Sequence, residues 1–381
     1  LSWDILDSFQ KATVESGIPQ IDDFNDGNNY GVSYFKVNQK SGFRWNTVKA
    51  FIKPIKNRKN LHIIKKCEVN NLILENNKVI GVDVTRNGKL EKFFVNKEVV
   101  LSVGSIGSPK ILELSGIGNH KVLSDLGIQT KINSVNVGEN LQDHLQLRVI
   151  YKLENAVTLN QKANSLLGKI GIGLEYVLNR SGPMSMAPSQ LGVFAMSDES
   201  YETPNLQFHV QPLSLDKFGD PLHDFPGLTA SVCNLNPQSR GSVHINSKDA
   251  KSPPDIDPRY LSEEQDRIVA AQSIRLARKI ITQPAMKKYN PKEYAPGIQF
   301  QSDEELKKVA GDIGTTIFHP VGTCAMGPSN SSVTDEELKV RGVEGLRIAD
   351  ASIMPSITSG NTNAPTLMIA EKASEMILNS N

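Results

Sequence analysis

The run TTIFHPVGTCAMG at residues 315–327 brings a histidine, a cysteine and two glycines close together in the chain. His319 and Cys324 are compatible with a thiolate–imidazole nucleophile pair, with two ligands of a metal site, or with a structural loop. His319 could also act alone as a general base, since a neutral imidazole with a pKa of about 6.5 accepts protons at physiological pH. Pro320 favours extended backbone at the histidine, which suits a ring held in place.

Two of these alternatives find little further support in the sequence. A metal site would need more histidine, cysteine or acidic ligands at fitting spacing, and none stands near the run. No acid is placed to orient the histidine for a neighbouring thiol. We therefore predict no metal site and a packing role for Cys324. The other cysteines, Cys67 and Cys233, are far away, so no disulfide framework is expected.

Composition excludes several classes of protein. The 381 residues carry 42 lysines and arginines against 41 acids, a formal net charge of +1, which gives no reason to propose a nucleic-acid partner. No apolar run approaches the ~18–20 residues that span a bilayer, so no transmembrane segment is expected. We expect a cytoplasmic or peripherally membrane-associated protein.

The sequence predicts several of the helices and strands that must position these residues. Residues 98–118, EVVLSVGSIGSPKILELSGIG, predict a strand, a glycine turn and a helix with Ser108 as N-cap and Pro109 at its first position. Asn87-Gly88 between two β-rich runs predicts a hairpin. Further expected elements are a helix over 1–20, strands over 205–212, 227–235 and 343–349, a helix over 262–284 and a last helix from Pro365.

Four separated blocks resemble the glucose–methanol–choline (GMC) flavin oxidoreductases. They are GSIGSPKILELSGIG at 104–118, VGENLQDH at 137–144, IFHPVGTCAMG at 317–327 and GVEGLRIADASIMPSITSGNTNAPTLMIAEKASEMI at 342–377. The resemblance implies an α/β fold, α+β overall, in which a Rossmann-like FAD-binding domain is interleaved with a substrate domain built on an antiparallel sheet with helices. The resemblance divides the chain into a segment on the substrate or lid side, 1–55, and a substrate-binding domain, 151–318. The FAD-binding domain is formed by 56–150 and by the C-terminal part, 319–381.

The resemblance also implies roles for individual residues. His319 corresponds to the family's catalytic base, and Asn361 to its hydrogen-bonding partner, six residues after the proline of the DASxxP loop. The residues expected to bind FAD are Val69 through its backbone, Asn140 in the flavin-side loop, Asp350 and Ala351 after the strand GLRIA, and Asn363, Pro365 and Thr366 at the start of the last helix. Taken without the family, each of these is an ordinary loop, strand-end or cap residue. His144 and His209 are expected to be structural.

One part of the family pattern is missing from this sequence. Family members begin with a strand–GxGxxG–helix unit around the FAD pyrophosphate, and no such motif with a preceding strand occurs here. We expect that this part belongs to a separate chain, was clipped away, or lies outside the sequence. A separate N-terminal chain or fragment completing the FAD site is therefore among the expected partners.

The implied activity is oxidation of a primary alcohol to an aldehyde, with oxygen or a quinone as electron acceptor. The alternatives are a redox-silent relative such as a hydroxynitrile lyase, a light-driven decarboxylase, or an inactive scaffold lacking the nucleotide-binding loop. The expected substrate region, 182–236, contains the apolar stretch GPMSMAPSQLGVFAM, which favours an aliphatic or aromatic alcohol. Choline would favour aromatic side chains and a carboxylate, which are scarce there.

Overall fold

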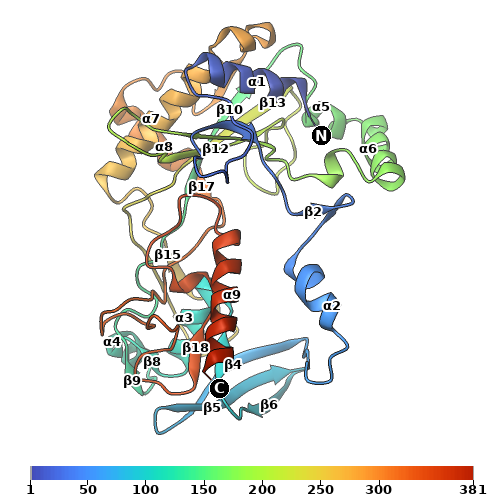
Figure 1. Cartoon of the computed structure of the whole chain (residues 1–381). Helices are drawn as coiled ribbons and strands as arrows, with labels where there is room; N and C mark the ends of the chain where they lie inside the picture. Colours follow the sequence, from blue (N-terminus) through green and yellow to red (C-terminus); the bar gives the residue numbers. More distant parts are fainter. Residues whose placement is uncertain (1, 381) are drawn as a thin grey trace. The chain divides into compact units, whose positions relative to one another are not determined.

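The computed structural model describes residues 2–380, which form two compact units assembled from alternating segments of the chain. The first unit comprises Leu1–His62, Leu145–Leu235 and Glu264–Thr315, and the second comprises Ile63–His144, Asn236–Glu263 and Thr316–Asn381. Figure 1 shows the elements of both units in the colours of the sequence. The residues expected to be catalytic or to bind FAD all belong to the second unit.

The first unit is built on a seven-stranded sheet in the part of the chain that the structure describes. Its strands follow the order β1-β11-β12-β13-β10-β16, antiparallel throughout this path, and β17 also pairs with β10. Their bounds are β1 Gly31–Tyr34, β10 Leu145–Lys152, β11 Leu191–Ala195, β12 Leu206–Gln211, β13 Gly227–Asn234, β16 Lys292–Ala295 and β17 Gly314–Thr316. A small β-hairpin, β2 Gln39–Lys40 and β3 Phe43–Arg44, belongs to the same unit.

The central strands of this sheet alternate between apolar and polar side chains. In LQLRVIYK, Leu147, Val149 and Tyr151 are buried and apolar, whereas the intervening positions include Gln146 and Arg148, also buried. Helix α7 contacts both β13 and β10, and its buried apolar stripe matches the apolar set of strand residues. The helices of this unit are α1 Asp4–Glu15, α2 Lys53–Ile55, α5 Leu159–Asn164, α6 Leu166–Asn179, α7 Glu264–Ile281 and α8 Asp303–Ile313.

The second unit combines an antiparallel three-stranded sheet with a short parallel pair. The sheet has the order β4-β5-β6, and β18 pairs in parallel with β7. Its elements are β4 Cys67–Glu75, β5 Lys78–Arg86, β6 Lys89–Phe94, β7 Val99–Leu101, α3 Gly104–Leu114, β8 Ile117–Gly118, α4 His120–Asp125, β9 Ile132–Asn133, β14 Ser242–His244, β15 Asp255–Asp257, β18 Leu346–Ile348 and α9 Asn363–Asn379. Their apolar side chains share one core, which includes Leu112, Val321, Cys324, Ile348 and Ile369.

Most predicted elements of this unit occur where the sequence placed them. Asn87 and Gly88 both have positive φ, 49° and 78°, as a two-residue type I′ hairpin turn requires. The prediction for 98–118 was wrong at the helix start: α3 begins at Gly104, so Pro109 lies inside the helix and Ser108 is not its N-cap. The last helix begins at Asn363, which makes Pro365 its third residue.

Candidate active site

Two short segments run side by side at the centre of the candidate site. Gln142 and Val321 exchange backbone hydrogen bonds of 3.0 and 2.9 Å, and the N–H of Ile317 donates to the carbonyl of His144 at 3.1 Å. This antiparallel pairing joins the VGENLQDH block to the HPVGT block, which are far apart in the sequence. It places Asp143 and His144 directly against the backbone and ring of His319.

Asp143 is the anchor of the His319 loop. One carboxylate oxygen accepts the backbone N–H groups of His319 at 2.8 Å and of His144 at 2.9 Å. The other oxygen accepts the hydroxyl groups of Thr316 and Tyr260. The carboxylate is buried, so these donors replace the water that an ion would otherwise require. Asp143 therefore anchors the His319 loop to the neighbouring segments through four hydrogen bonds.

The residue before His319 has an unusual backbone. Phe318 has a φ of 64°, a left-handed conformation that non-glycine residues adopt at a cost. Its N–H donates to the Thr316 hydroxyl at 2.9 Å, and that hydroxyl in turn donates to Asp143. The loop thus holds an unfavourable conformation through the same carboxylate that binds the His319 backbone.

The two partners of the His319 ring determine where its proton lies. The amide nitrogen of Asn361 is 3.3 Å from Nε2 of His319, and because an amide nitrogen only donates, Nε2 must accept. A neutral imidazole carries one proton, which then sits on Nδ1 and is donated to Nδ1 of His144 at 3.0 Å. His144 consequently carries its own proton on Nε2. The basic lone pair of His319 is therefore on the nitrogen that faces Asn361.

The surroundings of His319 favour this neutral form. Its side chain is 8% exposed, and burial lowers the pKa of the imidazole below its ordinary value, opposed by the Asp143 charge. Burial also raises the pKa of Tyr260, with a further contribution from Asp143, so the phenol remains protonated and donates to that carboxylate. The site thus combines a neutral imidazole with a carboxylate that accepts the backbone N–H of the same histidine.

Cys324 lies in the apolar core of the unit. It is fully buried, and burial raises the pKa of its thiol well above the usual range. A buried, protonated thiol is a poor nucleophile, and its backbone N–H is bonded to the Ser352 carbonyl at 2.8 Å. Among residues 2–380, no group of three or more His, Cys, Asp or Glu side chains is arranged to hold a metal ion.

Helix α3 is bonded to the His319 loop at the position of its internal proline. Pro109 lacks the N–H that would bond the Ser105 carbonyl one turn earlier, and the hydroxyl of Thr323 donates to that carbonyl at 2.6 Å instead. The Ser105 hydroxyl donates to the Pro320 carbonyl at 2.7 Å. The loop that carries His319 is therefore held by α3 on one side and by Asp143 on the other.

Asp350 links the end of β18 to the start of α3. One carboxylate oxygen accepts from the Ser352 N–H at 2.8 Å, and the other from the Gly104 N–H at 3.0 Å and the Ser108 hydroxyl at 2.6 Å. The carbonyl of Ala351 accepts the N–H of Gly322 at 3.3 Å. In this structure Asp350 and Ala351, which are both expected to contact FAD, hold the neighbouring loops together through these hydrogen bonds.

The start of α9 presents backbone N–H groups close to Asn361. Thr362 makes no side-chain cap, and Asn363 and Ala364 are exposed, so their N–H groups lack the usual capping oxygen. Pro365 is tolerated because the third helical N–H is also unpaired within a helix. The Thr366 hydroxyl donates back to the Thr362 carbonyl at 2.7 Å. This helix end carries partial positive charge immediately after the candidate pair.

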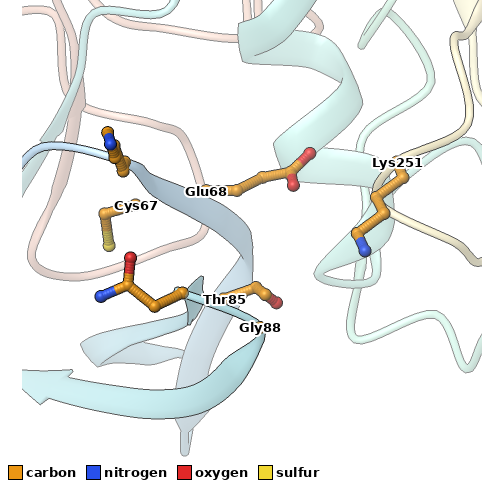
Figure 2. Close-up of a pocket in the computed structure, with 7 residues that line it drawn as sticks. Cys67, Glu68, Thr85, Gly88 and Lys251 are labelled. Carbon is orange, nitrogen blue, oxygen red and sulfur yellow. The ribbon is translucent and has the colours of Figure 1, made fainter.

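Two further predicted cofactor contacts lie elsewhere in the unit. Asn140, with a φ of 63°, donates to the carbonyls of Gly322 and Pro355 at 3.3 and 3.2 Å. Val69 lies on β4, next to a shallow pocket of about 470 Å³ that Figure 2 shows. That pocket is lined by Lys66, Cys67, Glu68, Thr85, the turn at Asn87 and Gly88, and Lys251.

The residues present fit the flavin end of FAD. They offer an unprotonated imidazole nitrogen, a donor amide and a helix N-terminus, which match a hydride-transfer site with negative charge developing on the flavin. No helix in the described part of the chain is long and apolar enough to cross a membrane. The sequence alone did not identify Asp143 and His144 as neighbours of His319, because only the pairing of two distant segments brings them there.

Sequence comparisons identify relatives along nearly the whole chain. Family models described as GMC oxidoreductase match residues 5–146 and 237–370. The chain is 36% identical over 376 residues to the oxygen-dependent choline dehydrogenase of Photobacterium profundum, covering 98% of this chain and 66% of the relative. It is 36% identical over 374 residues to an alcohol dehydrogenase [acceptor] of Pseudomonas putida, covering 97% and 68%. The chain thus spans about two thirds of the length of these relatives.

Solved structures of two oxidases have the same fold as this chain. A formate oxidase from Aspergillus oryzae matches with a TM-score of 0.92 at 26% identity, covering 99% of this chain and 70% of the other. A pyridoxine 4-oxidase matches with a TM-score of 0.86 at 27% identity, covering 97% and 69%. The predicted fold class, the FAD cofactor and the class of oxidoreductase acting on CH–OH donors are confirmed. The chain belongs to the GMC oxidoreductase family.

Proposed function

We propose that this chain carries the base and the hydrogen-bonding partner for FAD-dependent oxidation of a primary alcohol to an aldehyde. The observation that supports this most directly is the 3.3 Å contact between the Asn361 amide nitrogen and Nε2 of His319, in which the ring nitrogen is the acceptor. Nε2 accepts the hydroxyl proton, and Asn361 donates to the developing alkoxide oxygen. When bound, FAD supplies the acceptor for the hydride that leaves the α-carbon.

The remaining groups have supporting roles. Asp143 and His144 hold the base and its tautomer, and the start of α9 provides positive charge where the flavin becomes anionic. Asp350, Ala351, Asn363, Pro365 and Thr366 are proposed to surround the flavin, with Asn140 holding their loop. Val69 and the pocket beside it are proposed to bind the adenine end of FAD.

An anaerobic panel of alcohols identifies the substrate and the electron acceptor. The FAD-loaded protein is mixed anaerobically with a panel of aliphatic, aromatic and choline-type alcohols, and flavin absorbance is followed. Bleaching by at least one primary alcohol, with aldehyde formed in equal amount, is expected. Adding oxygen or a quinone to the reduced protein then shows which of the two reoxidises the flavin. Cyanide release from a cyanohydrin without bleaching by any alcohol would instead support a redox-silent lyase.

A further inference from the structure

Arg148 is a buried cation without a counterion in the first unit. It lies in the middle of β10, and its side chain is only 4% exposed. No ion pair to it is found among residues 2–380. Burial lowers the pKa of its guanidinium, but an arginine remains charged in a protein. A buried charge that is not paired is costly, so its retention in a sheet requires an explanation.

The hydrogen-bonding capacity of this guanidinium is largely unused. Nη2 makes one long contact of 3.4 Å with the Leu215 carbonyl. Nε and Nη1, which carry three of the five guanidinium N–H groups, have no partner. The ring of Phe218 lies 4.9 Å from the guanidinium carbon, but stacking covers the flat face and leaves the in-plane N–H groups unsatisfied.

The neighbours of Arg148 on the sheet are polar and include no carboxylate. Ser231 is directly opposite on β13, and its buried hydroxyl also has no partner. His209 is opposite Ser231 on β12, and Gln146 and Gln207 lie on the same face by the two-residue alternation of strands. At the buried positions of this face in β10, β12 and β13, no Asp or Glu accompanies Arg148, so its positive charge has hydrogen-bonding groups beside it but no counterion.

From these observations we propose that the polar face of the first unit's sheet is a binding site for a small organic carboxylate, with Arg148 as its counterion and Ser231 as a further hydrogen-bonding group. One guanidinium matches one carboxylate in charge and in planar geometry. A phosphate carries more charge than a single arginine balances. The proposal uses no residue of the His319 site and does not depend on the proposed reaction.

Binding of carboxylates and of their uncharged amides to the full chain tests this. Isothermal titration compares acetate, propionate and benzoate with acetamide, propionamide and benzamide. At least one carboxylate is expected to bind ten times more tightly than its amide. Arg148→Met is expected to weaken binding of that carboxylate at least tenfold and to leave binding of the amide unchanged. Arg148→Lys is expected to bind the carboxylate with intermediate affinity. The matched control Lys152→Met, an exposed cation on the same strand, is expected to bind like the unsubstituted chain.

The melting temperature without ligand separates a binding role from a structural one. Arg148→Met should melt at the same or a higher temperature, because it removes an unpaired buried charge. A lower melting temperature would show that the arginine holds the fold and would overturn the proposal. It is also overturned if no carboxylate binds more tightly than its amide, or if Arg148→Met binds the carboxylate unchanged. No arm requires flavin or turnover, so this result is separate from that for His319.

Discussion

Nδ1 of His144 lies 3.0 Å from Nδ1 of His319, with the two rings nearly perpendicular at 83°. One of these nitrogens must donate and the other accept, and Asn361 on the far side of His319 makes His319 the donor. A fully buried histidine thus sets which nitrogen of the candidate base is free to take a proton.

This relationship predicts different outcomes for two substitutions of His144. His144→Asn places an amide oxygen near the position of Nδ1 and should retain most activity. His144→Leu removes the acceptor and leaves a buried N–H unsatisfied, which costs about 1–3 kcal/mol, or roughly one to two orders of magnitude in kcat/KM. Steady-state kinetics on the FAD-loaded variants compares them. Equal activity of the Asn and Leu variants would contradict a role in holding the tautomer.

The lowered pKa of His319 predicts a pH profile. The base works only when neutral, so kcat/KM should be constant at neutral pH and fall as pH drops through a pKa below the ordinary value of about 6.5. Asn361→Asp places a carboxylate beside Nε2, favours the imidazolium and should move this limb to higher pH. Asn361→Ala removes only the amide donor to the neutral ring and should move the limb much less. A limb that stays in place in the Asp variant would show that another group titrates.

The four hydrogen bonds of Asp143 predict a stability difference between two variants. Asp143→Ala leaves buried donors unsatisfied and should lower the free energy of unfolding by about 2–4 kcal/mol. Asp143→Asn should cost less than half of that, because its oxygen accepts the two N–H groups and the hydroxyls of Thr316 and Tyr260 turn to accept from its NH₂. Urea unfolding of the full chain measures both. Equal losses would argue against this network.

Pro109 and Thr323 are predicted to be coupled. Thr323→Val removes the donor to the Ser105 carbonyl and should cost about 1–3 kcal/mol. Pro109→Ala restores a backbone N–H that bonds the same carbonyl, so it should be more favourable in the Thr323→Val background than in the original chain. A double-mutant cycle of unfolding free energies gives the coupling. Strict additivity would mean that the hydroxyl does not replace the missing helix bond.

The sequence could predict features that depend on local chemistry or on a family motif. The Asn87-Gly88 hairpin follows from the conformations those residues tolerate, and the proximity of Asn361 to His319 follows from the family pattern. The start of α3 was mispredicted because the local preference for proline at a first helical position ignores Thr323, which comes from a distant loop. The contacts of Asp143 and His144 with His319 could not be predicted for the same reason, because they depend on the tertiary pairing of two distant segments.

The rate of flavin reduction in His319→Ala tests the central claim most directly. The FAD-loaded protein is mixed anaerobically in a stopped-flow instrument with the best alcohol of the panel, alongside Cys324→Ala as the matched loop control. Loss of the base should slow reduction by about 10²- to 10⁴-fold, while the cysteine variant should reduce its flavin at the original rate. Reduction at an unchanged rate in His319→Ala would contradict the assignment of His319 as the base.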